Sequence, residues 1–419
     1  MQGIVRKKEK LLIIGAGIGQ VPIILKAKKM GVHVTVVTQP GNQPGISMAD
    51  DVFYCDIYDR ENIVSWAREN DITAVTSDQN DLMNPTVAYI AEKLGLPGNT
   101  FEQVMSYCNK NIYRDNCDRL SIPVPKHMAV SSINQDISSF KSPFPWIVKP
   151  ADSQSSVGVQ RVDNMEEFYP ALEFALAQSK TNSAIVEEFF VGKEIVCEGF
   201  INEGRYYLLS FADRKYFELK ELMIPSQTVF PSIVRRDLLD KVVEYEQIMA
   251  NYIKPKFAIV HSEYLINEDT GEIRVVESAL RGGGVYISSH LIPYATGIDI
   301  NEILLQKVLG KEVDMTEICD KNEKKAAGYV CFYLPEGRID TIQGLESVKE
   351  LPFVKMVCLD DIEIGQRTQK MLHKGLRKGP ILVVGENREN LEENIRVVQD
   401  TLKIKVIDDR GNCADIIWG

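Results

Sequence analysis

Two glutamates, Glu263 and Glu277, flank a turn within a β-rich stretch of the chain. Residues 257–280 predict a hairpin closed by the three-residue loop 269–271, with its glycine in the left-handed position. Counting back from this loop places Glu263 opposite Glu277, with Cβ atoms about 5 Å apart on one face. A hard cation such as Mg²⁺ takes one or two carboxylates and completes its shell with phosphate oxygens. The spacing therefore indicates a metal clamp.

The same register places Glu268 opposite Glu272 beside the turn. It also places four apolar residues on the face that carries the glutamates, so that face is expected to point inward: Ile259, Leu265, Ile273 and Val275. Opposed like charges in a half-buried setting are destabilising unless something neutralises them. Two alternatives remain open. A two-residue loop would pair Glu263 with Val276, and the stretch could be an ordinary surface hairpin with scattered acids.

Arg281 follows Glu277 by four residues and precedes three consecutive glycines, residues 282–284. Glycines let the backbone approach a ligand closely. A guanidinium beside a carboxylate–metal site suits negative charge that develops on phosphate or carboxylate oxygens. The alternative is a surface arginine in a flexible loop.

Lys149 ends the apolar run 146–148, where a lysine needs an anionic partner because strand interiors disfavour it. The small, polar loop 151–158 that follows can offer N–H groups and hydroxyls to phosphates. Further along, residues 187–194 join two strands with glutamates and aromatic residues, which suits an adenine and ribose pocket. Taken by itself, this last segment is better interpreted as a charged, solvated turn.

The elements that must position these residues fall into three blocks. The first hundred residues alternate strands with helices, which predicts a parallel α/β sheet. The turn at residues 15–19 resembles a dinucleotide fingerprint, but Gln20 stands at its sixth position, so a structural turn is favoured. A second block of short strands and helices begins near Cys108, and a third begins near Lys324.

Composition limits the classes of partner. The 419 residues contain 48 Lys and Arg against 59 Asp and Glu, for a net charge of −11. This balance argues against binding to nucleic acid or an anionic membrane, and no apolar stretch is long enough for a membrane span. The eight cysteines form no C-x-x-C pair, which favours reduced thiols in a cytoplasmic protein.

Taken in order, these residues resemble the ATP-grasp superfamily of carboxylate–amine ligases over nearly the whole chain. The sequence is similar to the L-amino-acid ligases and to the biotin carboxylase-like and carbamoyl-phosphate-synthase-like group. The motifs that carry the resemblance are Lys110 before residues 122–125, Lys149-Pro150, Ser156-x-Gly158, residues 187–194, Glu263 with Glu277 and Arg281, and residues 296–299.

The resemblance implies an α/β and α+β architecture of three domains. Residues 1–105 would form a Rossmann-like pre-ATP-grasp domain, and residues 106–318 an ATP-grasp domain with a lid at 146–190. Residues 319–419 would form a C-terminal α+β domain.

The resemblance also assigns roles within the site. Mg²⁺, with Mn²⁺ as an alternative metal, would bind Glu263 and Glu277, and Arg281 would stabilise the acyl-phosphate and the tetrahedral transition state. Lys110 and Lys149 would contact phosphates, and the loop with Ser156 and Gly158 would close over them. Glu187 and the backbone near Phe190 would hold adenine, and Glu194 the ribose. The ATP-binding residues implied are Lys110, Lys149, Ser156, Gly158, Glu187, Glu188, Phe190 and Glu194.

Some features depart from the pattern or stay open. Ala279 stands where many members carry an asparagine metal ligand, and the phosphate loop has one glycine. Residues 78–81, an acidic and amide run, would either face the substrate site or cap a helix. His261 and His290 would be substrate contacts or core histidines, and the second interpretation is favoured.

The function expected is ATP-dependent amide or dipeptide formation from a small carboxylate and an amine, with ADP and phosphate as products. Within the fold, a biotin carboxylase-type reaction with bicarbonate is the runner-up. Two further classes are an NAD-dependent dehydrogenase, which leaves Lys149 and the glutamate pair unexplained, and a non-catalytic nucleotide-binding module. A homodimer is one alternative for the assembly.

Overall fold

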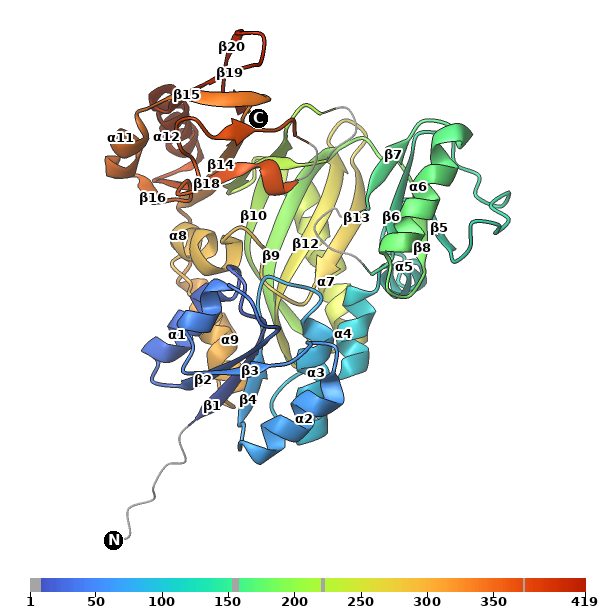
Figure 1. Cartoon of the computed structure of the whole chain (residues 1–419). Coiled ribbons are helices and arrows are strands. Elements are labelled where there is room, and N and C mark those ends of the chain that lie inside the picture. The colour runs from blue at the N-terminus through green and yellow to red at the C-terminus, as the bar shows by residue number, and fades with distance from the viewer. Residues whose placement is uncertain (1–8, 153–157, 220–222, 372–373) are drawn as a thin grey trace.

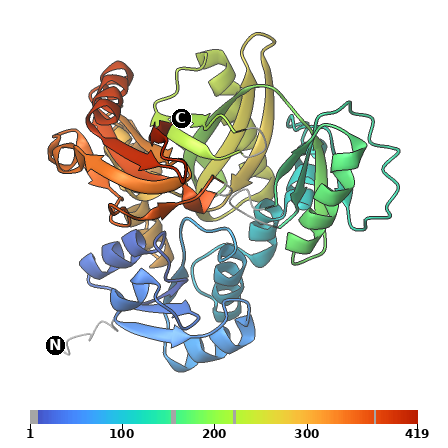
Figure 2. The same cartoon turned by 45° about the horizontal axis from the view of Figure 1, so that its top comes forward.

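The computed structural model of the chain describes residues 9–152, 158–219, 223–371 and 374–419. These residues form a long central sheet and three smaller sheets, which lie around it as an N-terminal unit, a lid and a C-terminal unit (Figures 1 and 2). Within these described ranges, no helix is long and apolar enough to cross a membrane.

The N-terminal unit is a parallel sheet of order β3-β2-β1-β4, as the sequence predicts. Its strands are β1 (Lys10–Ile14), β2 (His33–Thr38), β3 (Asp51–Tyr54) and β4 (Ala74–Thr76). Its helices are α1 (Val21–Lys29), α2 (Arg60–Glu69) and α3 (Asn84–Leu94), with the short η1 (Pro44–Ser47). Residues 11–14 are fully buried because helices cover both faces of a parallel sheet.

The lid is an antiparallel sheet of order β5-β8-β6-β7 that stands apart from the rest of the molecule (Figure 1). It consists of β5 (His127–Val130), β6 (Trp146–Pro150), β7 (Gln160–Val162), β8 (Ala184–Glu188) and the covering helix α6 (Met165–Gln178). Trp146 and Phe168 meet edge to face in its core. This separate core lets the lid behave as one body on its own connections.

The central sheet is antiparallel, in the order β13-β12-β9-β10-β11-β14-β18-β16, with β21 paired to β14. Its first strands are β9 (Lys193–Asn202), β10 (Arg205–Tyr216), β11 (Pro225–Phe230), β12 (Phe257–Asn267) and β13 (Glu272–Ala279). The rest are β14 (Ala326–Tyr333), β16 (Val354–Val357), β18 (Lys378–Gly385) and β21 (Ile417–Trp418). The sheet therefore crosses the domain boundary expected near residue 318.

Helices cover both faces of the central sheet. One face packs on α4 (Phe101–Cys108), α5 (Lys110–Arg119) and α7 (Arg236–Ile253). The other packs on η2, a π-helix (Ile287–Leu291), and on α8 (Ile292–Thr296) and α9 (Ile300–Val308). The sequence interpretation omitted α7, although its buried residues follow a helical period: Leu238, Leu239, Val242, Glu246, Met249 and Ala250.

The C-terminal unit adds a second antiparallel sheet of order β17-β15-β19-β20. Its strands are β15 (Gly337–Gln343), β17 (Arg367–Thr368), β19 (Lys403–Ile407) and β20 (Cys413–Asp415). The remaining helices are α10 (Met315–Asp320), α11 (Leu345–Glu350), α12 (Arg388–Thr401) and the short η3 (Lys374–Leu376).

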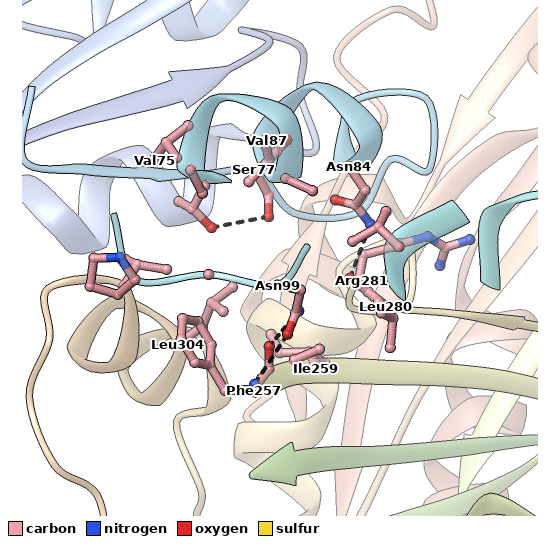
Figure 3. Close-up of a pocket in the computed structure, with 18 residues that line it drawn as sticks. Val75, Ser77, Asn84, Val87, Asn99, Phe257, Ile259, Leu280, Arg281 and Leu304 are labelled. Atoms are coloured by element: carbon pink, nitrogen blue, oxygen red, sulfur yellow. Dashed lines mark hydrogen bonds between the residues drawn. The ribbon is translucent and has the colours of Figure 1, made fainter. Parts of the chain in front are cut away.

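The N-terminal unit packs against the end of the β12–β13 hairpin around a small cavity of about 50 Å³ (Figure 3). The amide of Asn84 donates to the Leu280 carbonyl at 3.0 Å, and the amide of Asn99 donates to the Phe257 carbonyl at 2.8 Å. The Arg281 guanidinium lies at the edge of this cavity and points away from it. These contacts fix the N-terminal unit beside the residues that leave the hairpin.

Candidate active site

The β12–β13 hairpin places Glu263 directly opposite Glu277, as the sequence predicts. The turn differs from the prediction, because Asn267 pairs with Glu272 and four residues close the loop. The offset is corrected by a β-bulge at Val276, where two residues of β13 oppose one residue of β12. The predicted pairing of Glu268 with Glu272 is therefore wrong. Between the turn and Tyr264, the strands pair in the register of the two-residue-loop alternative. Continued without a bulge, that register would have placed Val276 opposite Glu263.

The bulge also changes which residues share the glutamate face. Ile273 and Val275 lie with Tyr264 and Ile266 in the core against α7, not beside Glu263 as expected. Their side chains are buried on the opposite face, because the extra residue reverses the alternation of β13. The glutamates themselves are half-buried, as expected, with side chains 22% and 28% exposed. A ligand can therefore reach them.

Glu263 lies among buried charged groups. Its carboxylate forms an ion pair with Arg214 on β10 and accepts from His261 Nε2 at 3.2 Å. The other ring nitrogen of His261 contacts the fully buried Glu198. Burial lowers the pKa of His261, but the carboxylates of Glu198 and Glu263 outweigh burial and raise it. The favoured interpretation of His261 as a core histidine with partners agrees with these contacts.

Arg214 also connects Glu263 to the predicted ribose residue. Its guanidinium lies 2.9 Å from Glu194, and the Tyr216 hydroxyl donates to the same carboxylate at 2.5 Å. Burial and the neighbouring charge of Glu263 outweigh the arginine and raise the pKa of Glu194 to about 7. Arg214 is therefore shared between two carboxylates, Glu194 and Glu263.

Glu277 is adjacent to a second cation and to a cavity. The ammonium of Lys110, the first residue of α5, lies 3.4 Å from its carboxylate. Beside them is a cavity of about 220 Å³ between the hairpin, the N-terminal unit and the base of the lid. Its lining includes Asp81, Asp152 and Lys180. Charges of both signs therefore surround a space of small-molecule size.

Lys149, the last residue but one of β6, places its ammonium 2.6 Å from Glu187 on β8. Arg114 of α5 reaches the same carboxylate at 2.7 Å, and all three side chains are almost fully buried. Burial alone would raise the pKa of Glu187, but Arg114 and Lys149 lower it to about 2. Each carboxylate oxygen of Glu187 thus already has a cationic partner.

Arg281 is held by the N-terminal unit. Its Nε and Nη2 donate to the two carboxylate oxygens of Asp81 at 3.0 and 2.7 Å. The fully buried Asp78 accepts from the Gly282 amide at 2.8 Å and from the Ser288 hydroxyl at 2.7 Å. The run 78–81 is therefore a clamp on the segment after the hairpin and not a side-chain cap of α3, whose N-cap is Met83.

The glycines after Arg281 are needed for close packing. A Cβ at Gly282 would lie 2.2 Å from Ser288, and one at Gly283 would lie 2.5 Å from Glu198. At Gly284 a Cβ would meet nothing within 4 Å. Two of the three glycines thus serve contacts within the protein, and Gly284 alone of this run leaves space for a ligand.

The N-terminal glycine turn lies near the same segment. Gln20 accepts from the Gly17 amide at 3.1 Å and donates to the Asp78 carbonyl at 2.7 Å. Gly19 packs on Gln79, which donates to Ser289 at 3.4 Å. The residue that breaks the dinucleotide fingerprint therefore has a structural role, which agrees with the predicted structural turn.

The remaining predicted ATP residues lie on or beside the lid. Glu188 follows Glu187 on β8, and the guanidinium of Arg274 stacks 4.8 Å from the centre of the Phe190 ring. Gly158 has φ +77°, and a Cβ there would lie 2.7 Å from Pro150. Ser156 lies outside the described residues.

The described residues contain no group of three or more His, Cys, Asp and Glu side chains arranged to hold a metal ion. The donor set nevertheless fits Mg²⁺, which binds through one or two carboxylates and substrate phosphates and does not require a full protein cage. Glu263 and Glu277 supply that pair in register on one face. Their present partners, Arg214 and Lys110, show that the pair attracts positive charge.

Three important residues escaped the sequence interpretation: Arg114, Arg214 and Tyr216. Arg114 follows Lys110 by four residues, so one helix face carries both cations, and this spacing was a usable signal. Arg214 lies in a strand interior, where a charged residue needs a partner just as Lys149 does.

A lid with a buried lysine facing a larger antiparallel sheet with paired glutamates defines the ATP-grasp class of fold. Residues 142–289 match the ATP-grasp domain family, so the chain contains an ATP-grasp domain and the predicted fold is confirmed.

Similarity to solved structures and curated proteins covers nearly the whole chain and not only that domain. The structure is similar to L-amino acid ligase from Bacillus licheniformis, with a TM-score of 0.80 and 23% identity over 95% of this chain and 99% of that chain. The sequence is 23% identical to formate-dependent phosphoribosylglycinamide formyltransferase of Prochlorococcus marinus over 95% of this chain and 98% of that protein. It is also 23% identical to the carbamoyl phosphate synthase large chain of Clostridium botulinum over 98% of this chain, which spans 40% of that protein.

Proposed function

We propose that the chain is an ATP-dependent ligase that activates a small-molecule carboxylate as an acyl-phosphate and couples it to an amine. The observation that carries this proposal is a separation of charge. Arg114 and Lys149 share one carboxylate, Glu187, and this lid-base cluster has one positive charge in excess.

The opposite excess lies on the central sheet, in a group named here the carboxylate cluster: Glu194, Glu198, Glu263 and Glu277 with Arg214, His261 and Lys110. Its four acids outnumber its two permanent cations and His261, whose raised pKa favours a third positive charge. A nucleotide phosphate satisfies the first cluster and a divalent cation satisfies the second, so the site suits a metal–nucleotide complex.

The reaction proposed has two steps. An oxygen of the substrate carboxylate attacks the γ-phosphorus of ATP, and ADP leaves. The amine nitrogen then attacks the acyl carbon, phosphate leaves with the C–O electron pair, and the nitrogen loses a proton. When bound, Mg²⁺ would supply charge neutralisation on the phosphoryl oxygens.

The side chains have separate roles in this proposal. Lys110 and Lys149 bind phosphate oxygens, and Arg281, oriented by Asp81, stabilises charge on the acyl-phosphate and the tetrahedral intermediate. The lid over them excludes water, which would hydrolyse the acyl-phosphate.

The nucleoside end is assigned to the lid side. Glu188 and the backbone near Phe190 line the adenine pocket, and Glu194 binds the ribose. Because both oxygens of Glu187 are engaged, its role in this proposal is to hold Lys149 and Arg114. Ser156 and Gly158 belong to the loop expected to cover the phosphates.

The cavity beside Lys110 and Glu277 is the proposed space for a small substrate. Its charges of both signs suit a polar substrate. The eight cysteines are free thiols, which supports the proposed cytoplasmic setting. The three-domain division with limits near 105 and 318, a homodimer and the use of Mn²⁺ remain parts of the proposal.

The test is hydroxylamine trapping. The full chain is incubated with ATP, Mg²⁺, hydroxylamine and each member of a panel of carboxylic acids, including amino acids and bicarbonate. The proposal predicts ADP, phosphate and a stable hydroxamate with at least one organic acid. ADP formation with bicarbonate alone would favour the carboxylase-type reaction, and no acid-dependent ADP formation across the panel would contradict the ligase assignment.

A further inference from the structure

One buried side chain joins the lid to the hairpin that carries the glutamate pair. Arg114 is 1% exposed, and its Nε donates to the Glu187 carboxylate at 2.8 Å. Its Nη2 donates to the backbone carbonyl of Val276 at 2.7 Å. A single guanidinium therefore contacts lid strand β8 and hairpin strand β13.

Val276 is the residue at which the register of the hairpin changes. β13 is the edge strand of the central sheet, so its outer carbonyl and N–H groups need partners from outside the sheet. Arg114 supplies a donor to Val276, and the Pro123 carbonyl accepts from the Val275 amide at 2.9 Å. Both partners come from the segment of α5 and the loop after it.

The bulge decides what lies opposite Glu263. With Tyr264 paired to Val275, an unbroken ladder would place Val276 opposite Glu263. The extra residue moves Glu277 into that place. Whatever stabilises the bulge therefore stabilises the paired carboxylates.

We propose that Arg114 is a positioning residue that holds the Val276 bulge, keeps Glu277 opposite Glu263, and couples the base of the lid to metal binding. This inference rests on the proposed function of the two glutamates as metal ligands. The coupling follows because one planar group donates to both the lid carboxylate and the bulge carbonyl.

An arginine is required for this role. Its fork donates in two directions from fixed nitrogens, whereas a lysine has one nitrogen on a flexible stem. Arg114→Lys would keep the charge beside Glu187 and would not hold Val276 at the same time. The lysine variant thus separates positioning from charge.

The experiment compares Arg114→Lys with Arg119→Lys, a matched change on the same helix at an exposed arginine that contacts Tyr252. Calorimetry measures ADP binding without metal, and the EPR signal of free Mn²⁺ measures metal binding with ADP present. Arg114→Lys is expected to weaken Mn²⁺ binding about 10-fold, as loss of a group that orients metal ligands does. Metal-free ADP binding is expected to change less than about twofold, and Arg119→Lys should match the wild type in both.

Arg114→Met provides a second variant, because Glu187 keeps Lys149 as its partner and no charge is left unpaired. It should also lose Mn²⁺ affinity, and it decides the matter if the lysine variant does not fold. Mn²⁺ affinity within about twofold of the wild type in the folded variant would overturn the positioning role alone. A wild-type chain that binds no Mn²⁺ with ADP would overturn the metal site itself, and the positioning role with it.

Discussion

The lid-base cluster and the carboxylate cluster contain the same residue types and differ in how completely they are satisfied. In the first, Arg114, Lys149 and Glu187 are almost fully buried, and both oxygens of the one carboxylate are engaged. In the second, Glu263 and Glu277 are about one quarter exposed and lie side by side in the sheet. The first region is nearly shielded from solvent and has one positive charge in excess, whereas the second is more exposed.

The shifts in acidity follow this difference. Two cations lower the pKa of Glu187 to about 2, whereas burial and a neighbouring acid raise the pKa of Glu194 to about 7. A buried acid with two cationic partners, such as Glu187, stabilises the fold. An acid with another acid beside it, such as Glu194, favours the binding of a further cation. Removing a carboxylate should therefore damage stability in the first region and catalysis in the second.

The largest effect expected is on the stability of Glu187→Gln. This change leaves Arg114 and Lys149 buried without an anion, which typically costs about 3–5 kcal/mol. Urea unfolding of the full chain checks it. A loss as small as that of a surface substitution would show that the cluster is more open to water than its burial indicates.

The same comparison has a pH dependence. The pKa of Glu187 is about 2 in the folded state against an ordinary value of 4.5. The ionised group thus contributes stability that is fully present above 4.5 and is lost as the pH falls toward 2. The urea midpoint of the wild type should decline over this window more steeply than that of Glu187→Gln. Parallel curves would contradict the lowered pKa.

Glu277→Gln should show the opposite pattern. Loss of one carboxylate from the metal pair is expected to lower ADP-forming turnover by about 100- to 1,000-fold. Its unfolding free energy should stay within about 1 kcal/mol of the wild type, because an acid is removed from a cluster with excess acid. A large loss of stability with normal turnover would reverse the roles of the two regions.

A smaller effect is expected where the N-terminal unit orients Arg281. Asp81→Asn removes the bidentate carboxylate that holds the guanidinium. Turnover should fall by about 10- to 100-fold through misplacement, with little change in ADP affinity. Steady-state kinetics together with ADP calorimetry check this split, and an equal loss in both quantities would place Arg281 in nucleotide binding.

The smallest effect is expected at the tip of the hairpin, where Glu272 is exposed and pairs with Arg274. Glu272→Gln should leave both turnover and the thermal midpoint unchanged. It is the matched control for Glu277→Gln on the same strand. A measurable loss of turnover would mean that the tip contacts substrate or the lid.

The sequence predicts the local elements of this fold well, because apolar periodicity records which face of each segment is buried. The parallel sheet of the first hundred residues and the hairpin at 257–280 both follow from pattern. The bulge at Val276 does not, because a bulge depends on partners such as Arg114 that are 162 residues away in the chain. The paired position of Glu277 was predicted from a wrong loop length.

The candidate site is harder to predict than the fold, since ion pairs join distant segments. Asp81 lies 200 residues from Arg281, and the run 78–81 reads from sequence as either a helix cap or a substrate contact. The structure shows a clamp between this run and the segment after the hairpin, an alternative that local spacing does not reveal. Arg214 escaped for a related reason, since its partners Glu194 and Glu263 lie on other strands.

The central claim is that Lys110 and Lys149 bind nucleotide phosphate while Glu263 and Glu277 bind the metal that accompanies it. Calorimetric ADP titrations with and without Mg²⁺, in the wild type, Glu277→Gln and Lys149→Met, test it most directly through thermodynamic coupling. We predict that Mg²⁺ strengthens ADP binding in the wild type and not in Glu277→Gln, and that Lys149→Met weakens ADP binding under both conditions. An undiminished effect of Mg²⁺ in Glu277→Gln would contradict the assignment of the metal to the glutamate pair.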